Sequence, residues 1–305
     1  MKKIILDTDP GIDDAIAICY ALNHPQLEVL ALTTIYGNVA TSLATQNALR
    51  MCELNNRIVP VATGAAVPLQ ITPNPVADFV HGSNGFGEIE LPQPALKPVT
   101  SNAAELMVEL INRHPGEVTL VAVGPLSNLA LALNLAPDIT QKVKEVVVMG
   151  GAFHREGNVS KHAEANIWND PHAARQVLTA DWPVTVHGLD VTYKISFSAQ
   201  YLEEIAEQSP AVGSFLRDAA KFYSAFYKSQ HNFDGCCPHD QLALSYLCNP
   251  EWYELEYGSL DVITEGEAIG KTTINTSDNT NKAIATDVSH EQLLADYAAV
   301  LSQAV

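Results

Sequence analysis

Four aspartates lie close together near the start of the chain, within the sequence IILDTDPGIDDA: Asp7, Asp9, Asp13 and Asp14. The apolar run at residues 4–6 predicts a strand, Pro10 and Gly11 predict a sharp turn, and residues 15–22 predict a helix. Carboxylates gathered at the end of a strand repel one another unless a cation neutralises them. Oxygen ligands suit a hard ion, Ca²⁺ or Mg²⁺, and not zinc.

Helix capping is the alternative explanation for these acids, because aspartate is favoured in the first turn of any helix. Capping accounts for Asp13 or Asp14 alone. It does not account for the whole group, since Asp7 and Asp9 precede the turn. An EF-hand is also excluded, because Ile18 stands where the calcium loop would need a bidentate glutamate.

Further polar residues that could do chemistry follow later predicted strands. They are Asn38 after residues 29–36, His81 in the motif VHGSNGFG, Asn158, Glu164 and Asn166 in the segment GNVSKHAEANIWNDP, and His239 with Asp240 in the motif PHD. Asp240 could cap the next helix or complete the oxygen ligands begun by the amino-terminal cluster. Asp170, before Pro171, is typical of a helix N-cap with proline at the first helical position.

The elements that must position these residues alternate between strand and helix. Strands are predicted at 29–36, 59–63, 118–123, 145–149 and 184–187, and helices at 42–54, 102–112, 199–207, 212–228, 242–247 and 289–302, the last capped by Ser289. Residues 68–98 form a long irregular excursion, and 252–287 predict short strands. We expect one α/β domain over 1–305, an open, mostly parallel, doubly wound sheet flanked by helices, with ligand-binding loops at the carboxyl ends of its strands.

Composition limits the partners. The 305 residues contain 17 Lys and Arg against 35 Asp and Glu, a net charge of −18, which disfavours nucleic acid polymers and anionic membrane surfaces. The amino terminus lacks the apolar segment of a signal peptide, and no later run is long enough to span a membrane. The five cysteines have no metal-type spacing. We therefore expect a cytoplasmic protein with reduced thiols and a neutral small-molecule ligand.

Three functions fit this set of residues. Metal-assisted hydrolysis at a sugar would use a metal-bound water, a carboxylate as the base and a histidine as the acid. Phosphoryl transfer is the second, because Asp7 and Asp9 form an Asp-x-Asp pair like that of haloacid-dehalogenase-type phosphatases, although the late strand VVVMGG ends without an acid. A calcium-binding or sugar-binding module without activity is the third.

Seven sequence blocks in collinear order narrow this choice. They are DTDPGIDDA, TTIYGN, VHGSNG, VAVGPLSN, VVMGGA, GN with AEANI, and PHD. Together they closely resemble the inosine-uridine-preferring nucleoside hydrolases. The resemblance implies hydrolysis of the N-glycosidic bond of ribonucleosides such as inosine, uridine or cytidine, a bound Ca²⁺, and a homodimer or homotetramer. Restriction to pyrimidine nucleosides is the alternative within the family.

The resemblance also implies a role for each matching residue. Asp9, Asp14, the carbonyl of Val123 and Asp240 would hold the ion, and Asp9 would accept the proton of the attacking water. Asp13, Asn38 and Asn166 would bind or support the 2′- and 3′-hydroxyl side, and Met149, Asn158 and Glu164 the 5′-hydroxyl. His239 would protonate the departing base, with His81 beside it, and Tyr227 and His231 would contact the base. Asp7 is left to a supporting role.

Two departures from the family pattern affect the 5′ side. Ala165 replaces the aromatic residue that is common between the Glu and the Asn of the motif, and Lys161 with His162 stand where small or apolar residues are usual. The resemblance therefore leaves the base preference open.

Overall fold

The structure is a computed structural model that describes residues 1–231, 235–278 and 280–304. Its strands are β1 (Lys2–Thr8), β2 (Leu27–Thr34), β3 (Val61–Thr63), β4 (Val118–Ala122), β5 (Glu145–Met149), β6 (Val184–His187), β7 (Tyr253–Tyr257), β8 (Ser259–Val262), β9 (Thr272–Asn275) and β10 (Lys282–Val288). The α-helices are α1 (Ile12–Asn23), α2 (Thr41–Leu54), α3 (Asp78–His81), α4 (Ala103–Arg113), α5 (Ser127–Leu135), α6 (Ala165–Asn169), α7 (Pro171–Thr179), α8 (Leu189–Thr192), α9 (Ala199–Gln208), α10 (Val212–His231), α11 (Gln241–Cys248) and α12 (His290–Leu301). Short 3₁₀ turns cover Pro137–Gln141 and Pro250–Trp252.

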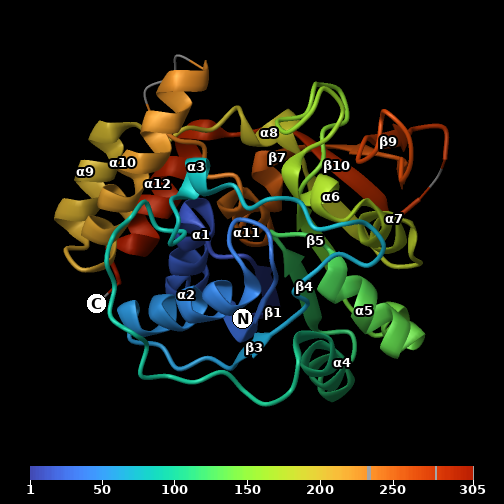
Figure 1. The fold of residues 1–305 in the computed structure, drawn as a ribbon, viewed down its shortest axis with the longest axis horizontal. Coiled ribbons are helices and arrows are strands. Elements are labelled where there is room, and N and C mark those ends of the chain that lie inside the picture. Colours follow the sequence, from blue (N-terminus) through green and yellow to red (C-terminus); the bar gives the residue numbers. More distant parts are fainter. Residues whose placement is uncertain (232–234, 279, 305) are drawn as a thin grey trace.

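Eight strands form the main sheet in the order β3-β2-β1-β4-β5-β6-β10-β7, and Figure 1 shows the helices around it. Counted across the sheet, the seven strands β3, β2, β1, β4, β5, β6 and β10 all run parallel, and β7 forms the last edge, antiparallel to β10. The chain winds outward from β1 through β2 to β3, then returns to place β4 on the other side of β1. Ligands bind at such a reversal of strand order, outside the carboxyl ends of the strands, so the end of β1 is the expected place for a site.

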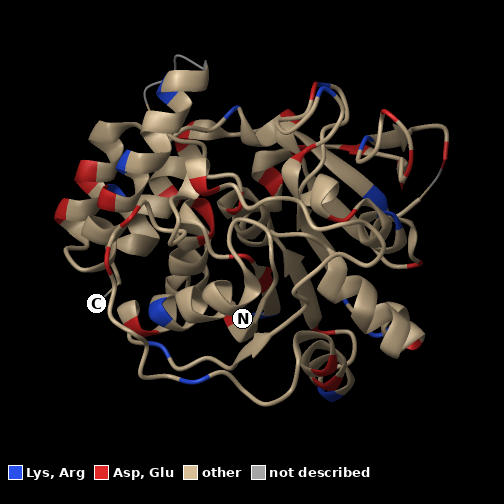
Figure 2. Ribbon diagram, viewed as in Figure 1, with Lys and Arg blue, Asp and Glu red and all other residues tan. Residues whose placement is uncertain are grey.

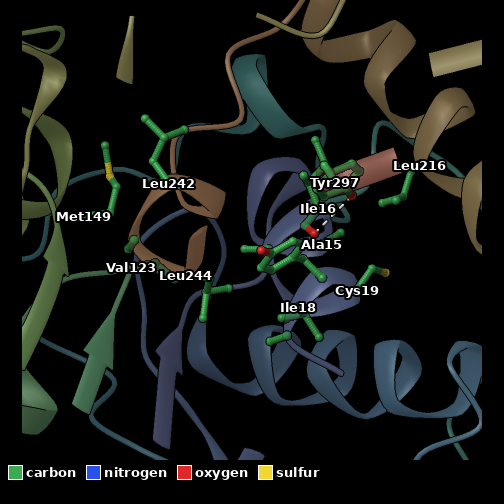
Figure 3. Packing of buried hydrophobic residues seen from close by; sticks show 14 of the residues in the cluster. Ala15, Ile16, Ile18, Cys19, Val123, Met149, Leu216, Leu242, Leu244 and Tyr297 are labelled. Carbon is green, nitrogen blue, oxygen red and sulfur yellow. Dashed lines mark hydrogen bonds between the residues drawn. The ribbon is translucent and has the colours of Figure 1, made fainter. Parts of the chain in front are cut away.

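Buried side chains form two hydrophobic clusters, one on each face of the sheet. Ile4 and Leu6 of β1 belong to the first cluster and Ile5 to the second, as alternation along a strand requires. Helix α1 is buried along most of its length in the first cluster, where Tyr297 of α12 donates a hydrogen bond to the carbonyl of Ile16, 3.2 Å away (Figure 3). The helix that carries the acidic residues is therefore held rigidly by packing on several sides.

The sequence-based elements agree with these bounds to within a few residues, and the mostly parallel α/β sheet is confirmed. Asp170 caps α7 as predicted, its Oδ1 accepting from the amide of Ala173 at 3.0 Å. The predicted cap at Ser289 is wrong: that residue occupies the N-cap position of α12, but its side chain makes no capping hydrogen bond. Asp240 likewise occupies the N-cap position of α11 without making a capping hydrogen bond, so its carboxylate is available for another role.

The irregular excursion after β3 crosses the rim of the sheet and returns as the one-turn helix α3 (Figure 1). The amide of Leu69 donates to Oδ2 of Asp170 at 2.8 Å, and the side-chain amide of Asn74 donates to the carbonyl of Trp168 at 3.3 Å. These contacts fix the path that carries His81 over the amino-terminal cluster.

Charge is unevenly distributed along the ribbon, as Figure 2 shows. Some acidic residues lie on outer helices, and others lie at the end of β1, where their side chains are buried. Among the residues that the structure describes, no helix is long and apolar enough to cross a membrane.

Candidate active site

The turn between β1 and α1 folds around the carboxylate of Asp14. Its Oδ1 accepts hydrogen bonds from the hydroxyl of Thr8 and from the amide of Asp9, the latter at 3.1 Å. Its Oδ2 accepts from the amide of Gly11 at 2.9 Å and from Nδ2 of Asn38 at 3.0 Å. Asp14 thus caps its own helix, as the alternative explanation requires, and it also lies at the floor of the site.

Asp9 lies beside this turn with one oxygen satisfied and one not. Oδ2 accepts from the amide of Asn38 at 2.7 Å, whereas Oδ1 is buried and has no hydrogen-bond partner among the described residues. Two glycines make room for it: a Cβ added at Gly37 would lie 2.0 Å from Oδ2, and one at Gly124 would lie 2.5 Å from Oδ1. Backbone from the ends of β2 and β4 therefore encloses the carboxylate on both sides.

Asp13 and Asp240 complete a buried acidic group. One carboxylate oxygen from each of Asp13, Asp14 and Asp240 lies within 4.8 Å of the others. Oδ2 of Asp13 accepts from the hydroxyl of Tyr223 at 3.4 Å, and its Oδ1 has no partner among the residues described. The structure therefore brings residues more than two hundred positions apart to one point. The trio contains Asp13, which the resemblance assigned to the sugar, and it does not contain Asp9, which the resemblance assigned to the ion.

Burial makes these carboxylates hard to ionise. Burial raises the pKa of Asp9 well above the ordinary range, and the charge of Asp14 raises it further. Burial likewise raises the pKa of Asp240, and the charge of Asp13 adds to that shift. Burial followed by the charge of Asp14 raises the pKa of Asp13 to about 8. Burying several like charges is strongly unfavourable unless a cation compensates them. The unpartnered oxygens of Asp9 and Asp13 are the kind of donor that a divalent cation binds, so the residues fit such an ion.

Asp7 is separate from this group, which supports its secondary role. Its Oδ1 accepts from the hydroxyl of Thr33 at 2.6 Å and from Nδ2 of Asn128 at 2.8 Å, so it ties β1 to β2 and α5. Burial raises its pKa to about 7.

The loop after β5 supplies the opposite wall. Nδ2 of Asn166 donates to the carbonyl of Val123 at 2.8 Å and to that of Met149 at 3.2 Å, which links the ends of β4 and β5. Glu164 caps α6, with its carboxylate accepting from the amides of Asn166, Gly151 and Ile167 at 2.9, 2.9 and 3.2 Å. Burial nevertheless raises its pKa.

Asn158 stands next to this wall. Its Oδ1 accepts from the amide of Ala165 at 3.0 Å, so its Nδ2 is the group left for a ligand. Ala165 and the exposed Val159 line the pocket here with small side chains. Lys161 and His162 are not among the residues that line this pocket; they line a separate depression together with residues 152–156 and Lys271.

His81 is buried above the acidic group. Its Nδ1 accepts from the amide of Ile12 at 3.2 Å and lies 3.9 Å from Oδ1 of Asp13. Burial lowers its pKa to about 3, so the ring is neutral at physiological pH. A neutral ring that accepts at Nδ1 carries its hydrogen on Nε2. His81 is therefore suited to donate a hydrogen bond, and it cannot act as a strong proton source.

His239 lies at the end of a chain of hydroxyl groups. Its Nε2 is 2.6 Å from the hydroxyl of Tyr227, and its Nδ1 is 2.7 Å from that of Thr192. The hydroxyl of Tyr227 is 3.3 Å from that of Tyr223, which reaches Asp13. A continuous polar path thus runs from the acidic group to the imidazole.

Most of these groups face one pocket. Every predicted site residue with a described side chain lines this pocket except Asp9 and Asp14, which lie buried beneath it. The pocket is also lined by residues that the sequence did not predict: Tyr223, Phe226, Tyr193, Phe79, Val80, Ala77 and Val159. The side chain of His231 is outside the described part of the chain. Sequence reasoning missed Tyr223 and Thr192, although the spacing of Tyr223 and Tyr227 by four residues places both on one face of a helix.

Comparison with known proteins shows the family of this chain. The family model for inosine-uridine preferring nucleoside hydrolases matches residues 4–295. The chain is 44% identical over 271 residues to a probable uridine nucleosidase 1 of Oryza sativa subsp. japonica, covering 88% of this chain and 84% of that one. It is 36% identical over 276 residues to the inosine-uridine preferring nucleoside hydrolase of Crithidia fasciculata, covering 90% and 86%.

Solved structures show the same fold. A plant nucleoside hydrolase superimposes with a TM-score of 0.94 at 36% identity, over 99% of both chains. A purine-preferring ribonucleoside hydrolase from Gardnerella vaginalis superimposes with a TM-score of 0.95 at 31% identity, over 99% of this chain and 98% of that one. The chain belongs to the inosine-uridine preferring nucleoside hydrolase family, and it is an enzyme that hydrolyses the N-glycosidic bond of ribonucleosides.

Proposed function

We propose that this enzyme uses Ca²⁺ to hydrolyse both pyrimidine and purine ribonucleosides, such as uridine, cytidine and inosine, to ribose and free base. The observation that carries the proposal is the buried trio Asp13, Asp14 and Asp240 at the floor of a pocket with aromatic walls. Among the described lining residues there is no Lys or Arg, so the pocket suits a neutral sugar and a flat base rather than a phosphate.

The cation would be held by Asp9, Asp14, Asp240 and the carbonyl of Val123, with Asp13 near enough to join them. Carboxylate and carbonyl oxygens, completed by two sugar hydroxyls, suit the large and flexible coordination shell of Ca²⁺ better than the small octahedral shell of Mg²⁺. When bound, a divalent cation neutralises the buried acids, orients the sugar diol and acidifies a water molecule.

The residues of the chain then carry the proton transfers. Asp9 accepts one proton from the attacking water through Oδ1, the oxygen that has no partner, and the water oxygen bonds to C1′ of the ribose. The electrons of the C1′–N bond move to the base, and the base takes up a proton that His239 supplies. The surrounding carboxylates stabilise the positive charge that develops on the sugar.

The remaining polar residues position the substrate. Asp13, Asn38 and Asn166 lie around the acidic group, where the 2′- and 3′-hydroxyls would be bound. Asn158, Glu164 and Met149 lie toward the loop after β5, where the 5′-hydroxyl would be bound. His81 would donate a hydrogen bond from Nε2 on the base side, where its ring lies 5.1 Å from that of Tyr223. The names of the relatives, which include uridine nucleosidases and a purine-preferring hydrolase, support a test of both base classes.

A nucleoside panel tests this proposal. Purified enzyme is incubated with uridine, cytidine, inosine and adenosine, and free ribose is measured before and after prolonged chelation and again after Ca²⁺ or Mg²⁺ is added. We expect ribose from at least uridine and inosine, loss of activity on chelation, and recovery with Ca²⁺. Release from pyrimidine nucleosides alone would establish the restricted alternative, and recovery with Mg²⁺ alone would contradict the choice of ion.

A variant tests the base. Asp9→Asn should reduce kcat by a factor of about 10³ or more, because general base catalysis contributes ~10²–10⁴ and the buried amide also weakens cation binding. Asp261→Asn is the matched control, since Asp261 lies on the surface, paired with Arg175 at 2.9 Å. Near-normal turnover by Asp9→Asn protein would sink the assignment.

A further inference from the structure

His239 is held at both ring nitrogens by hydroxyl groups from different parts of the fold. Tyr227 of α10 lies at Nε2, 2.6 Å away, and Thr192 of α8 lies at Nδ1, 2.7 Å away. The Tyr227 side faces the pocket, whereas Thr192 is fully buried and does not line it. Thr192 therefore cannot touch a bound nucleoside, and its contact with the imidazole is its link to the reaction.

The position of Thr192 is fixed by a rigid frame. The amide of Leu189 donates to the carbonyl of Gly151 at 2.9 Å, and the amide of Thr192 donates to the carbonyl of Gly188 at 3.1 Å. Asp190 accepts from the amides of Phe153 and His154 at 2.9 and 2.7 Å, which binds α8 to the loop after β5. The hydroxyl is thus presented by backbone that is tied down on several sides.

The next residue packs against the same ring. Tyr193 meets His239 edge to face, with ring centroids 5.2 Å apart and planes at 86°, and the guanidinium of Arg155 lies 4.2 Å from the centre of the Tyr193 ring. Packing of this kind restrains the tilt of the imidazole, but it does not select which way the ring turns about its Cβ–Cγ bond. A hydrogen bond at Nδ1 does select it.

We propose that Thr192 is a positioning residue that orients the His239 imidazole for proton delivery to the departing base. This inference rests on the function proposed above. A ring with its hydrogen on Nδ1 donates to the Thr192 oxygen at 2.7 Å, and this bond stays in place whatever proton passes at Nε2, the nitrogen that faces Tyr227. The ring keeps its orientation while the C1′–N bond breaks and the base takes up the proton.

The test compares Thr192→Val, which keeps the shape and removes the hydroxyl, with Thr192→Ser, which keeps the hydroxyl. Each is assayed on uridine, on inosine and on p-nitrophenyl β-D-ribofuranoside, whose leaving group needs no proton. Misalignment of a proton donor costs roughly 10- to 100-fold. We expect a loss of that size in kcat for Thr192→Val on both nucleosides, little change in KM, and near-normal turnover of the activated riboside.

Controls separate positioning from general damage. Thr192→Ser should restore nucleoside hydrolysis to within a few-fold of wild type. Thr185→Val removes a hydroxyl from β6 of the same region, 3.5 Å from that of Tyr246, and should leave all three rates unchanged. Thr192→Ala serves in the same comparison if the valine variant does not fold.

The outcomes are distinct. Equal losses on the nucleosides and on the activated riboside would overturn the inference, because a structural defect affects both. Full nucleoside activity in a folded Thr192→Val or Thr192→Ala protein would overturn it as well. Wild-type protein that releases ribose from no substrate would instead refute the proposed function itself.

Discussion

Without the proposed cation, the stability of this enzyme should fall as the pH rises. Without a cation, the carboxylates of Asp9, Asp13, Asp14 and Asp240 remain buried together, and their pKa values are raised in the folded protein. A carboxyl group whose folded pKa is raised favours folding when it is protonated. That contribution is lost as the pH rises from the unfolded pKa through the folded one.

The magnitude can be worked from Asp13. Its pKa rises from 3.8 to about 8, so one group loses roughly 5–6 kcal/mol of stability as the pH rises from about 4 to above 8, at about 1.4 kcal/mol for each pKa unit. For a chain of this size 1 kcal/mol moves Tm by about 2 °C, which predicts a fall of roughly 10 °C over that whole range and of about 6 °C between pH 5.5 and 8.5. Bound Ca²⁺ should remove most of this loss.

The assay is thermal unfolding from pH 5.5 to 8.5, after chelation and again with Ca²⁺ restored. Tm of the chelated protein should fall as the pH rises, and the increase in Tm on adding Ca²⁺ should be greatest at pH 8.5. Asp13→Asn should flatten the fall, whereas the surface variant Asp261→Asn should keep it. A chelated protein that is equally stable or more stable at pH 8.5 would refute the reasoning.

Two further changes probe the geometry of the site. Gly37→Ala should lower kcat at least ~100-fold, because the new Cβ would lie 2.0 Å from Oδ2 of Asp9 and displace it. Gly266→Ala is the control, because at its φ of +77° an alanine adds backbone strain but its Cβ meets nothing within 4 Å; equal activities would contradict the expectation. His81→Gln should lower kcat/KM by about tenfold without changing the shape of its pH profile from 5 to 8, because a ring with a pKa of about 3 stays neutral there; loss of an acid limb in that range would contradict this.

Much of the fold could be predicted from the sequence because its strands are short, apolar and punctuated by glycine. The details that failed were local: Ser289 occupies the N-cap position without making the capping bond. In the site, the motifs located Asp9, Asp14 and Asp240, but the positions of Tyr223 and Thr192 depend on how α10 and α8 pack against His239. The spacing of Tyr223 and Tyr227 shows only that they share a helix face. No periodicity or motif reports that Tyr223 reaches Asp13 or that Thr192 reaches His239, since these partners lie far apart in sequence.

The environment of Asp9 shows how strand order determines function here. Gly37 follows β2 and Gly124 follows β4, and nothing in the sequence says that the two are neighbours. The order β2-β1-β4 places them on either side of the residue that follows β1, where the amides of Ile35 and Val123 donate to the carbonyls of Thr8 and Asp7 at 3.1 and 2.9 Å. A side chain at either glycine would displace the carboxylate. The reversal of strand order therefore produces both the opening for a ligand and the close backbone walls that hold Asp9 at its floor.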